Sequence, residues 1–223
     1  MVDIQYAIDV FSRDEALRAA DTAAGAGVNC FEAGHVLVKA VGVGIVTELR
    51  ARFPGAEIVA DMKTMDMGRD EVAVAADAGA HLVIVCAAAS DGVLLAAQKE
   101  AAARDVGLLV SLMGVRRRVE RTRQLLDLGL GRVIAHRGID DDFLWSDPLP
   151  FADLTELAGL PDIDLVLAGG VNASSVKAFS RIPVSRLIVG RGITDADRPR
   201  DHIAALTAAA AAQTSSLPLG AGE

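Results

Sequence analysis

Two hydrophobic patterns alternate along nearly the whole chain. Short runs rich in Val, Ile and Leu, without helical spacing, are followed by longer stretches with apolar residues at i, i+3 and i+4. The short runs predict eight strands, at residues 4–10, 28–34, 57–62, 81–87, 107–114, 132–136, 164–170 and 186–192. Helix signals lie between them: Ser12 and Glu15 have capping-box spacing, and the stretch 116–129 closes on Gly129 as a helix C-cap would.

This order of elements predicts an α/β fold. Near-continuous apolar strands that alternate with helices are typical of a parallel sheet covered on its outer face. Eight such units in 223 residues fit a single-domain (β/α)8 TIM barrel, which we expect to span residues 1–212. A doubly wound open sheet is the alternative. Residues 213–223 have the composition of a disordered C-terminal tail.

Composition and charge narrow the classes of partner. The net charge is −8, with Lys and Arg scattered, which argues against a nucleic-acid groove or an anionic membrane surface. An anionic substrate would need a locally positive pocket. The N-terminus lacks the basic start and long apolar stretch of a signal peptide. Cys30 and Cys86 each lie in an apolar run, so we expect buried, reduced thiols in a cytoplasmic protein, with a disulfide as the alternative.

Charged residues stand where several predicted strands end. In a barrel the carboxyl ends of the strands build the active face. Asp9, Glu32, Asp61, Lys63 and His136 all fall at such ends. A single acid there can equally cap a helix or form a surface ion pair. Five charged positions converging on one rim favour a functional site.

The stretch 59–68, VADMKTMDMG, carries the densest charge. Residues two apart on a strand point to the same side, so Asp61 and Lys63 should both face the barrel mouth, with Asp66 on the following loop. An ammonium flanked by carboxylates stays charged and can act as an electrostatic clamp or proton donor. Glu32 and Asp61, from neighbouring strands, could share Mg²⁺. A structural salt-bridge cluster is the alternative.

Two further groups of residues suggest chemistry at the same rim. Glycines end the last two strands and predict a phosphate cradle with one arginine: Gly169, Gly170, Gly190, Arg191 and Gly192. Ordinary turns are the alternative. His136 opens a polar segment and suits a proton shuttle, although a lone histidine is often structural. His35 follows Gly34 at a predicted helix start, and we expect it on the surface or as a cap.

Five blocks then occur in a recognisable order: FEAG, DMKTMDMG, HRGID, LAGGV and VGRGIT. Together they resemble the orotidine 5′-monophosphate decarboxylase superfamily over residues from about 3 to 210, and the second and third blocks are most similar to its 3-hexulose-6-phosphate synthases. The resemblance implies a homodimeric barrel with active sites at the subunit interface, Mg²⁺ as cofactor and a phosphorylated ketose as substrate. It implies that Glu32 and Asp61 bind the metal, that Lys63 is the central cation, that Asp66 reaches into the partner's site and that His136 is a general acid/base.

The chain departs from that pattern at three positions. Ser111 stands where the metal-dependent members place a carboxylate, and Ile139 stands where the synthases usually carry a second arginine. Arg137 resembles the related 3-keto-L-gulonate 6-phosphate decarboxylases more than the synthases.

We therefore expect a Mg²⁺-dependent aldehyde-lyase that condenses formaldehyde with D-ribulose 5-phosphate through a 1,2-enediolate. Lys63, Asp61, Asp66 and His136 are the expected catalytic residues, and Asp9, Arg137 and Asp140 the expected substrate contacts. A decarboxylase of the 3-keto-L-gulonate 6-phosphate type is the first alternative. A non-catalytic barrel that binds a sugar phosphate is the second.

Overall fold

Eight parallel strands form a closed barrel in the computed structural model, which describes residues 2–140, 153–178 and 182–216. Each strand pairs with the next, and the last pairs with the first. The strands are β1 (Asp3–Ile8), β2 (Cys30–Ala33), β3 (Glu57–Thr64), β4 (Leu82–Cys86), β5 (Gly107–Ser111), β6 (Arg132–His136), β7 (Asp164–Ala168) and β8 (Arg186–Val189). All eight predicted strands are confirmed, and the closed barrel excludes the open-sheet alternative.

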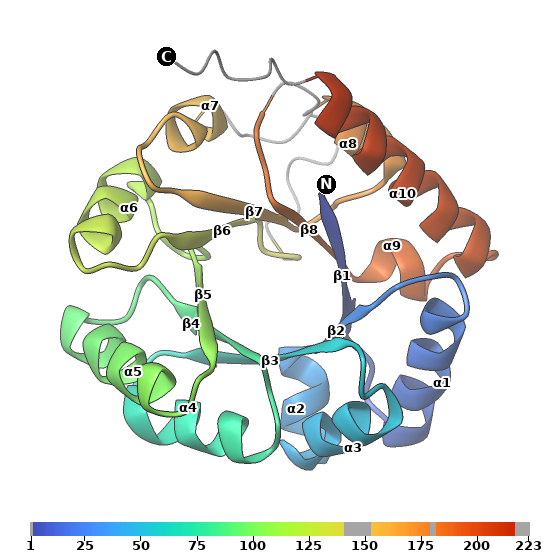
Figure 1. The fold of residues 1–223 in the computed structure, drawn as a ribbon, viewed down its shortest axis with the longest axis horizontal. Coiled ribbons are helices and arrows are strands. Elements are labelled where there is room, and N and C mark those ends of the chain that lie inside the picture. The colour runs from blue at the N-terminus through green and yellow to red at the C-terminus, as the bar shows by residue number, and fades with distance from the viewer. Residues whose placement is uncertain (1, 141–152, 179–181, 217–223) are drawn as a thin grey trace.

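Helices surround the barrel on its outer side (Figure 1). They are α1 (Arg13–Ala24), α2 (His35–Val41), α3 (Gly44–Arg52), α4 (Gly68–Asp77), α5 (Asp91–Ala103), α6 (Arg118–Asp127), α7 (Leu154–Ala158), α8 (Ala173–Ala178), α9 (Arg191–Thr194) and α10 (Pro199–Ser216). The predicted ends of two helices are confirmed. Ser12 caps α1 by accepting a hydrogen bond from the Glu15 N–H at 3.2 Å. Gly129, with φ +76°, lies just beyond the α6 C-cap.

The apolar residues divide into two layers because side chains alternate across each strand. One layer packs the strands against the helices. The other fills the barrel interior and consists of Ala7, Cys30, Val59, Leu82, Ile84, Leu109, Ile134, Val166, Ala168 and Ile188. Both cysteines are buried and unpaired, as predicted. Together with a few buried polar side chains, these residues fill the interior, so an open site can form only at the two ends of the barrel.

Two observations concern the ends and surface of the chain. Helix α10 continues to Ser216, so the first residues of the predicted tail 213–223 are helical, and residues 217–223 lie outside the described residues. In the part of the chain that the structure describes, no helix has the length and apolar character needed to cross a membrane.

Candidate active site

Three carboxylates meet at the carboxyl ends of the first three strands. Asp9 directly follows β1, while Glu32 lies in β2 and Asp61 in β3, each of these two only 3% exposed. Burial and then the charge of Asp61 raise the pKa of Asp9. Burial, Asp61 and Asp9 together raise the pKa of Glu32 to about 8. Burial first, and then the neighbouring acids, therefore disfavour the ionised forms of Asp9 and Glu32.

Lys63 supplies the positive charge at this cluster. Its ammonium forms a hydrogen-bonded ion pair with Asp61, and its side chain is only 15% exposed. Burial acts to lower the pKa of Lys63, but the charge and hydrogen bond of Asp61 outweigh it, so the pKa is raised and the ammonium stays charged. The two side chains do meet, as the sequence predicts.

The backbone between Asp61 and Lys63 does not have regular strand geometry. Strand β3 runs two residues further than predicted, and its register with β4 shifts between Asp61 and Thr64. Lys63 has a left-handed backbone with φ +47°. Simple alternation along an extended strand does not describe this segment, and the local irregularity aims the ammonium back at Asp61.

His35 belongs to the same cluster, which corrects the expectation of a surface or capping residue. It does begin α2, but its Nδ1 lies 3.8 Å from Asp61 Oδ2 and 3.9 Å from Asp9 Oδ1. Burial and then the charge of Lys63 lower its pKa. Gly34 permits this close entry, because a Cβ there would lie 2.2 Å from Asp9 Oδ1.

His136 ends β6 and contacts Ser111, an interaction that the sequence did not predict. Its Nδ1 lies 3.1 Å from the hydroxyl oxygen of Ser111, which also accepts a hydrogen bond from the Met113 N–H at 3.3 Å. Burial, followed by the charges of Lys63 and His35, lowers the pKa of His136 to about 3. The imidazole is therefore neutral at neutral pH.

The predicted phosphate cradle lies at the ends of β7 and β8. Gly169 and Gly170 have φ of +91° and +70°, and a Cβ on Gly169 would lie 2.3 Å from the Arg137 carbonyl oxygen. A Cβ on Gly190 would lie 3.5 Å from Asp9 Oδ2, which places this loop beside the acidic cluster. Arg191 begins α9, is exposed, and helps to lower the pKa of Asp9 against the larger effect of burial.

Helix α8, which follows β7, does not offer its first backbone N–H groups to this cradle. Asn172 Oδ1 accepts hydrogen bonds from the N–H groups of Ser174 and Ser175 at 2.9 and 3.0 Å. These donors at the start of α8 are therefore already bonded within the chain. An anion here would meet the glycine backbone, including Gly192, and Arg191.

Three further predicted residues follow strands β3 and β6. Asp66 is exposed on the loop after β3, where it accepts a hydrogen bond from the Met67 N–H at 2.8 Å. Arg137 follows β6 and is 6% exposed, and Asp140 is exposed. Among the described residues, neither Asp66 nor Asp140 forms a hydrogen bond or ion pair with the cluster.

The acidic cluster suits a divalent cation. Burial and the neighbouring acids raise the pKa values of Asp9 and Glu32, and the Oδ1 atoms of Asp9 and Asp61 are buried without a hydrogen-bond partner, so a cation here would stabilise the ionised acids. Within the described ranges, no group of three or more His, Cys, Asp or Glu side chains is arranged to hold a metal ion by itself. Mg²⁺ commonly binds only one or two carboxylates and keeps water or substrate oxygens as its other ligands. Glu32 and Asp61 are compatible with that mode.

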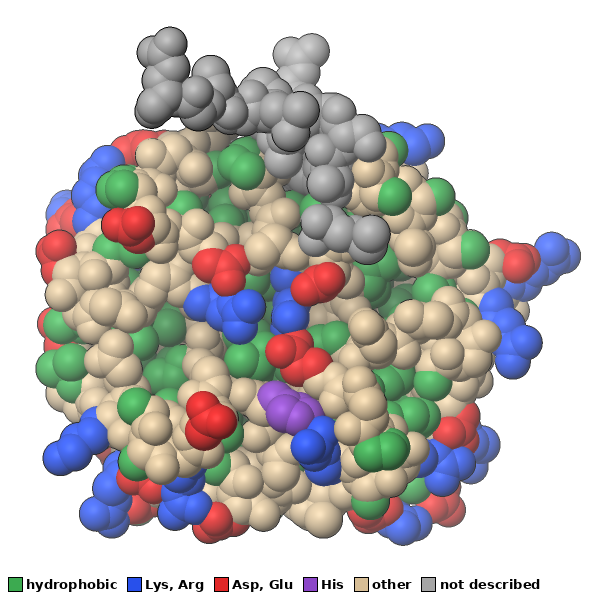
Figure 2. Space-filling view, in the orientation of Figure 1, with side chains coloured by type: hydrophobic (Ala, Val, Ile, Leu, Met, Phe, Trp, Pro, Cys, Tyr) green, Lys and Arg blue, Asp and Glu red, His purple; other side chains and the backbone are tan. Residues whose placement is uncertain are grey.

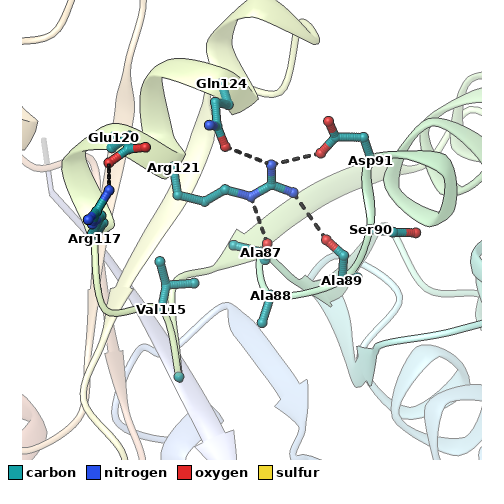
Figure 3. Close-up of a pocket in the computed structure, with 11 residues that line it drawn as sticks. Ala87, Ala88, Ala89, Ser90, Asp91, Val115, Arg117, Glu120, Arg121 and Gln124 are labelled. Atoms are coloured by element: carbon teal, nitrogen blue, oxygen red, sulfur yellow. Dashed lines mark hydrogen bonds and ion pairs between the residues drawn. The ribbon is translucent and has the colours of Figure 1, made fainter.

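A hollow of about 540 Å³ lies beside the barrel, between the segments that follow β4 and β5 (Figure 3). Arg121, which is partly buried, lines the hollow; it donates to the carbonyls of Ala87 and Ala89 at 2.8 and 3.1 Å and pairs with Asp91 at 2.7 Å. The guanidinium is thus engaged in bracing the loop. The other arginine lining the hollow, Arg117, is exposed and pairs with Glu120 at 3.2 Å.

Comparisons with known proteins agree with this geometry. A family model, Orotidine 5′-phosphate decarboxylase / HUMPS family, matches residues 3–206. The 3-hexulose-6-phosphate synthase of Mycobacterium gastri is 32% identical over 211 residues, covering 93% of this chain and 99% of the relative. A crystal structure of a 3-hexulose-6-phosphate synthase superposes with a TM-score of 0.82 at 31% identity, covering 93% of this chain and 99% of the other. A crystal structure of KGPDC from Streptococcus mutans gives a TM-score of 0.83 at 27% identity, covering 95% of this chain and 98% of the other.

Proposed function

Because the chain belongs to the orotidine 5′-phosphate decarboxylase / HUMPS family, we propose that it is a Mg²⁺-dependent aldehyde-lyase that reversibly condenses formaldehyde with D-ribulose 5-phosphate to 3-hexulose 6-phosphate. The observation that carries the proposal is the likeness to 3-hexulose-6-phosphate synthases over nearly the whole chain. The cluster of Glu32, Asp61 and Lys63 beside a neutral His136 supports it, because these groups suit enediolate chemistry.

The metal would be held by Glu32 and Asp61. When bound, Mg²⁺ supplies Lewis-acid stabilisation of the negative charge that develops on the substrate oxygens. Lys63 adds a fixed ammonium to the same region, and preorganised charge of this kind is commonly the largest contribution to catalysis. The glycine-rich loops with Arg191 would bind the substrate phosphate, and Asp9 would contact the sugar.

His136 would move the proton. Its neutral imidazole accepts the C1 proton of the ketose, and the C1–H electron pair becomes part of the 1,2-enediolate. C1 then forms a bond to the formaldehyde carbon, while the formaldehyde C=O electron pair moves onto its oxygen. That oxygen takes the proton back from His136, which regenerates the neutral base.

A homodimer would complete the site. Asp66 lies on an exposed loop between two exposed methionines, Met65 and Met67, which are 52% and 62% exposed. Large exposed apolar side chains around an acid suit a protein interface. In this arrangement Asp66 would reach into the partner's site.

Decarboxylation of a 3-keto-L-gulonate 6-phosphate-type substrate is the second candidate. Two observations favour it: Arg137 follows His136, and the structural neighbours include KGPDC from Streptococcus mutans. The reaction would pass through the same type of enediolate, so the site alone accommodates either substrate.

Proton NMR in D₂O separates these functions. Ribulose 5-phosphate is incubated with protein and Mg²⁺, with and without formaldehyde. The proposal predicts exchange of a C1 proton and, with formaldehyde, new hexulose 6-phosphate signals. Both should be lost in Lys63→Met and retained in Lys99→Met, an exposed lysine on α5. Exchange without a hexulose product would favour the decarboxylase, and absence of both would refute the synthase.

A further inference from the structure

A row of buried polar side chains crosses the barrel interior, although the layer around it is apolar. It begins with Arg186 at the start of β8, continues through Gln5 in β1 and ends at Glu32 in β2. Arg186 is 6% exposed and Gln5 is fully buried. Apolar side chains could fill the same space without the cost of desolvating polar groups, so these residues call for an explanation.

The hydrogen bonds of Gln5 have a fixed direction. A guanidinium can only donate, so the Gln5 oxygen must face Arg186, whose Nη1 donates to Oε1 at 3.0 Å. The amide NH₂ must then face Glu32, and Nε2 donates to Glu32 Oε2 at 2.5 Å. Arg186 therefore determines which end of the Gln5 amide is presented to the carboxylate.

Arg186 is itself held in place at the opposite end of the barrel from the candidate site. Its Nη1 pairs with Glu57 at 2.6 Å, and its Nη2 lies 3.7 Å from Asp3. Figure 2 shows the end of the barrel at which the chain begins, with acidic, basic and histidine side chains gathered near its centre. The row thus connects a charged cluster at this end to the acids at the mouth.

We propose that Gln5, oriented by Arg186, is a positioning residue for Glu32. The bond from Gln5 engages Oε2 of Glu32 and so fixes how the carboxylate is turned toward the mouth of the barrel. This inference rests on the proposed function in assigning Glu32 to the metal. Hydrogen-bond partners of metal ligands commonly contribute 10- to 100-fold to metal affinity, roughly the size of effect expected here.

The test is the affinity of the full-length protein for Mn²⁺, measured by electron paramagnetic resonance. Gln5→Met keeps a similar volume and removes both hydrogen bonds, so we expect Mn²⁺ binding to weaken by about 10- to 100-fold. Gln98→Met is the matched control, because Gln98 lies on α5 outside the barrel and donates to the Leu128 carbonyl at 3.1 Å. Its affinity should equal that of wild type. Equal affinities for wild type and Gln5→Met would overturn the proposal.

A double-mutant cycle separates positioning from a general effect on the fold. If Gln5 acts through Glu32, adding Gln5→Met to Glu32→Gln should not weaken Mn²⁺ binding further. A further loss in that background, as large as in wild type, would overturn the proposal. Arg186→Lys keeps the charge but not the guanidinium geometry, and should fall between wild type and Gln5→Met. It also provides a second variant if Gln5→Met does not fold.

Crystal structures without metal distinguish failure of this inference from failure of the proposed function. If wild type neither binds Mn²⁺ nor exchanges the C1 proton, the proposed function fails. The position of the Glu32 carboxylate in metal-free Gln5→Met still decides the inference. A rotated carboxylate supports positioning by Gln5, and an unchanged one overturns it.

Discussion

His136 gives the sharpest quantitative prediction, because its charge state is tied to folding. Its pKa is about 3 in the folded protein, against an ordinary value of 6.5 in the unfolded chain. Above pH 6.5 both states are neutral and the residue costs nothing. As the pH falls, the unfolded chain takes up a proton that the folded protein does not, so stability is lost. At pH 5, about 1.5 units below the unfolded pKa, the loss is about 2 kcal/mol, from about 1.4 kcal/mol per pH unit.

The assay is urea unfolding of metal-free protein at pH 8 and pH 5, comparing wild type with His136→Gln. The measurement at pH 8 gives the packing effect of the substitution alone. Between pH 8 and pH 5, wild type should lose about 2 kcal/mol more than the variant, because only wild type carries this imidazole. Parallel losses would refute the reasoning. So would an NMR titration in which the His136 imidazole protonates near pH 6.5.

Three further predictions concern other parts of the site. Lys63→Met removes the ammonium that pairs with Asp61, and under the proposed function it should lower the rate of C1 proton exchange by about 10²- to 10³-fold, whereas Lys99→Met should match wild type. A milder loss would show that another group stabilises the developing charge. Gly34→Ala places a Cβ 2.2 Å from Asp9 Oδ1, so the free energy of unfolding measured in urea should fall by about 1–3 kcal/mol. An unchanged free energy of unfolding would contradict that close contact. Arg121→Met removes the hydrogen bonds that hold the loop after β4, so the free energy of unfolding should fall by about 1–3 kcal/mol while the C1 proton exchange rate of the folded protein stays the same. A lower exchange rate would show that the adjacent hollow is part of the site.

The barrel and the rim residues could be predicted from the sequence because their signals are local. A change of hydrophobic period marks each strand and helix, and the cap at Ser12 satisfies backbone donors only three residues away. Once parallel strands are assigned, their carboxyl ends must share one face. That rule brings Asp61 and Lys63 to the same end of the barrel, and the left-handed backbone at Lys63 then turns the ammonium toward Asp61.

The missed features depend on contacts between strands distant in sequence. The contact of Ser111 with His136 joins residues 25 apart, and the bond from Arg186 to Gln5 joins residues 181 apart. Such contacts follow from strand stagger and side-chain rotamers, which periodicity does not encode. The expectation for His35 is wrong for a related reason, since a helix start gives no indication of which way its first side chain turns.

The left-handed backbone at Lys63 has a consequence for protein engineering. Lys63 and Met67, at φ +47° and +51°, hold a conformation that ordinary residues adopt at a cost of roughly 1–2 kcal/mol each. Glycine or asparagine would relieve that strain, so a library screened only for heat resistance would be expected to enrich them at position 63. The same enrichment would remove the ammonium. Directed evolution of this barrel should therefore keep position 63 constant, or screen for turnover and thermal tolerance together.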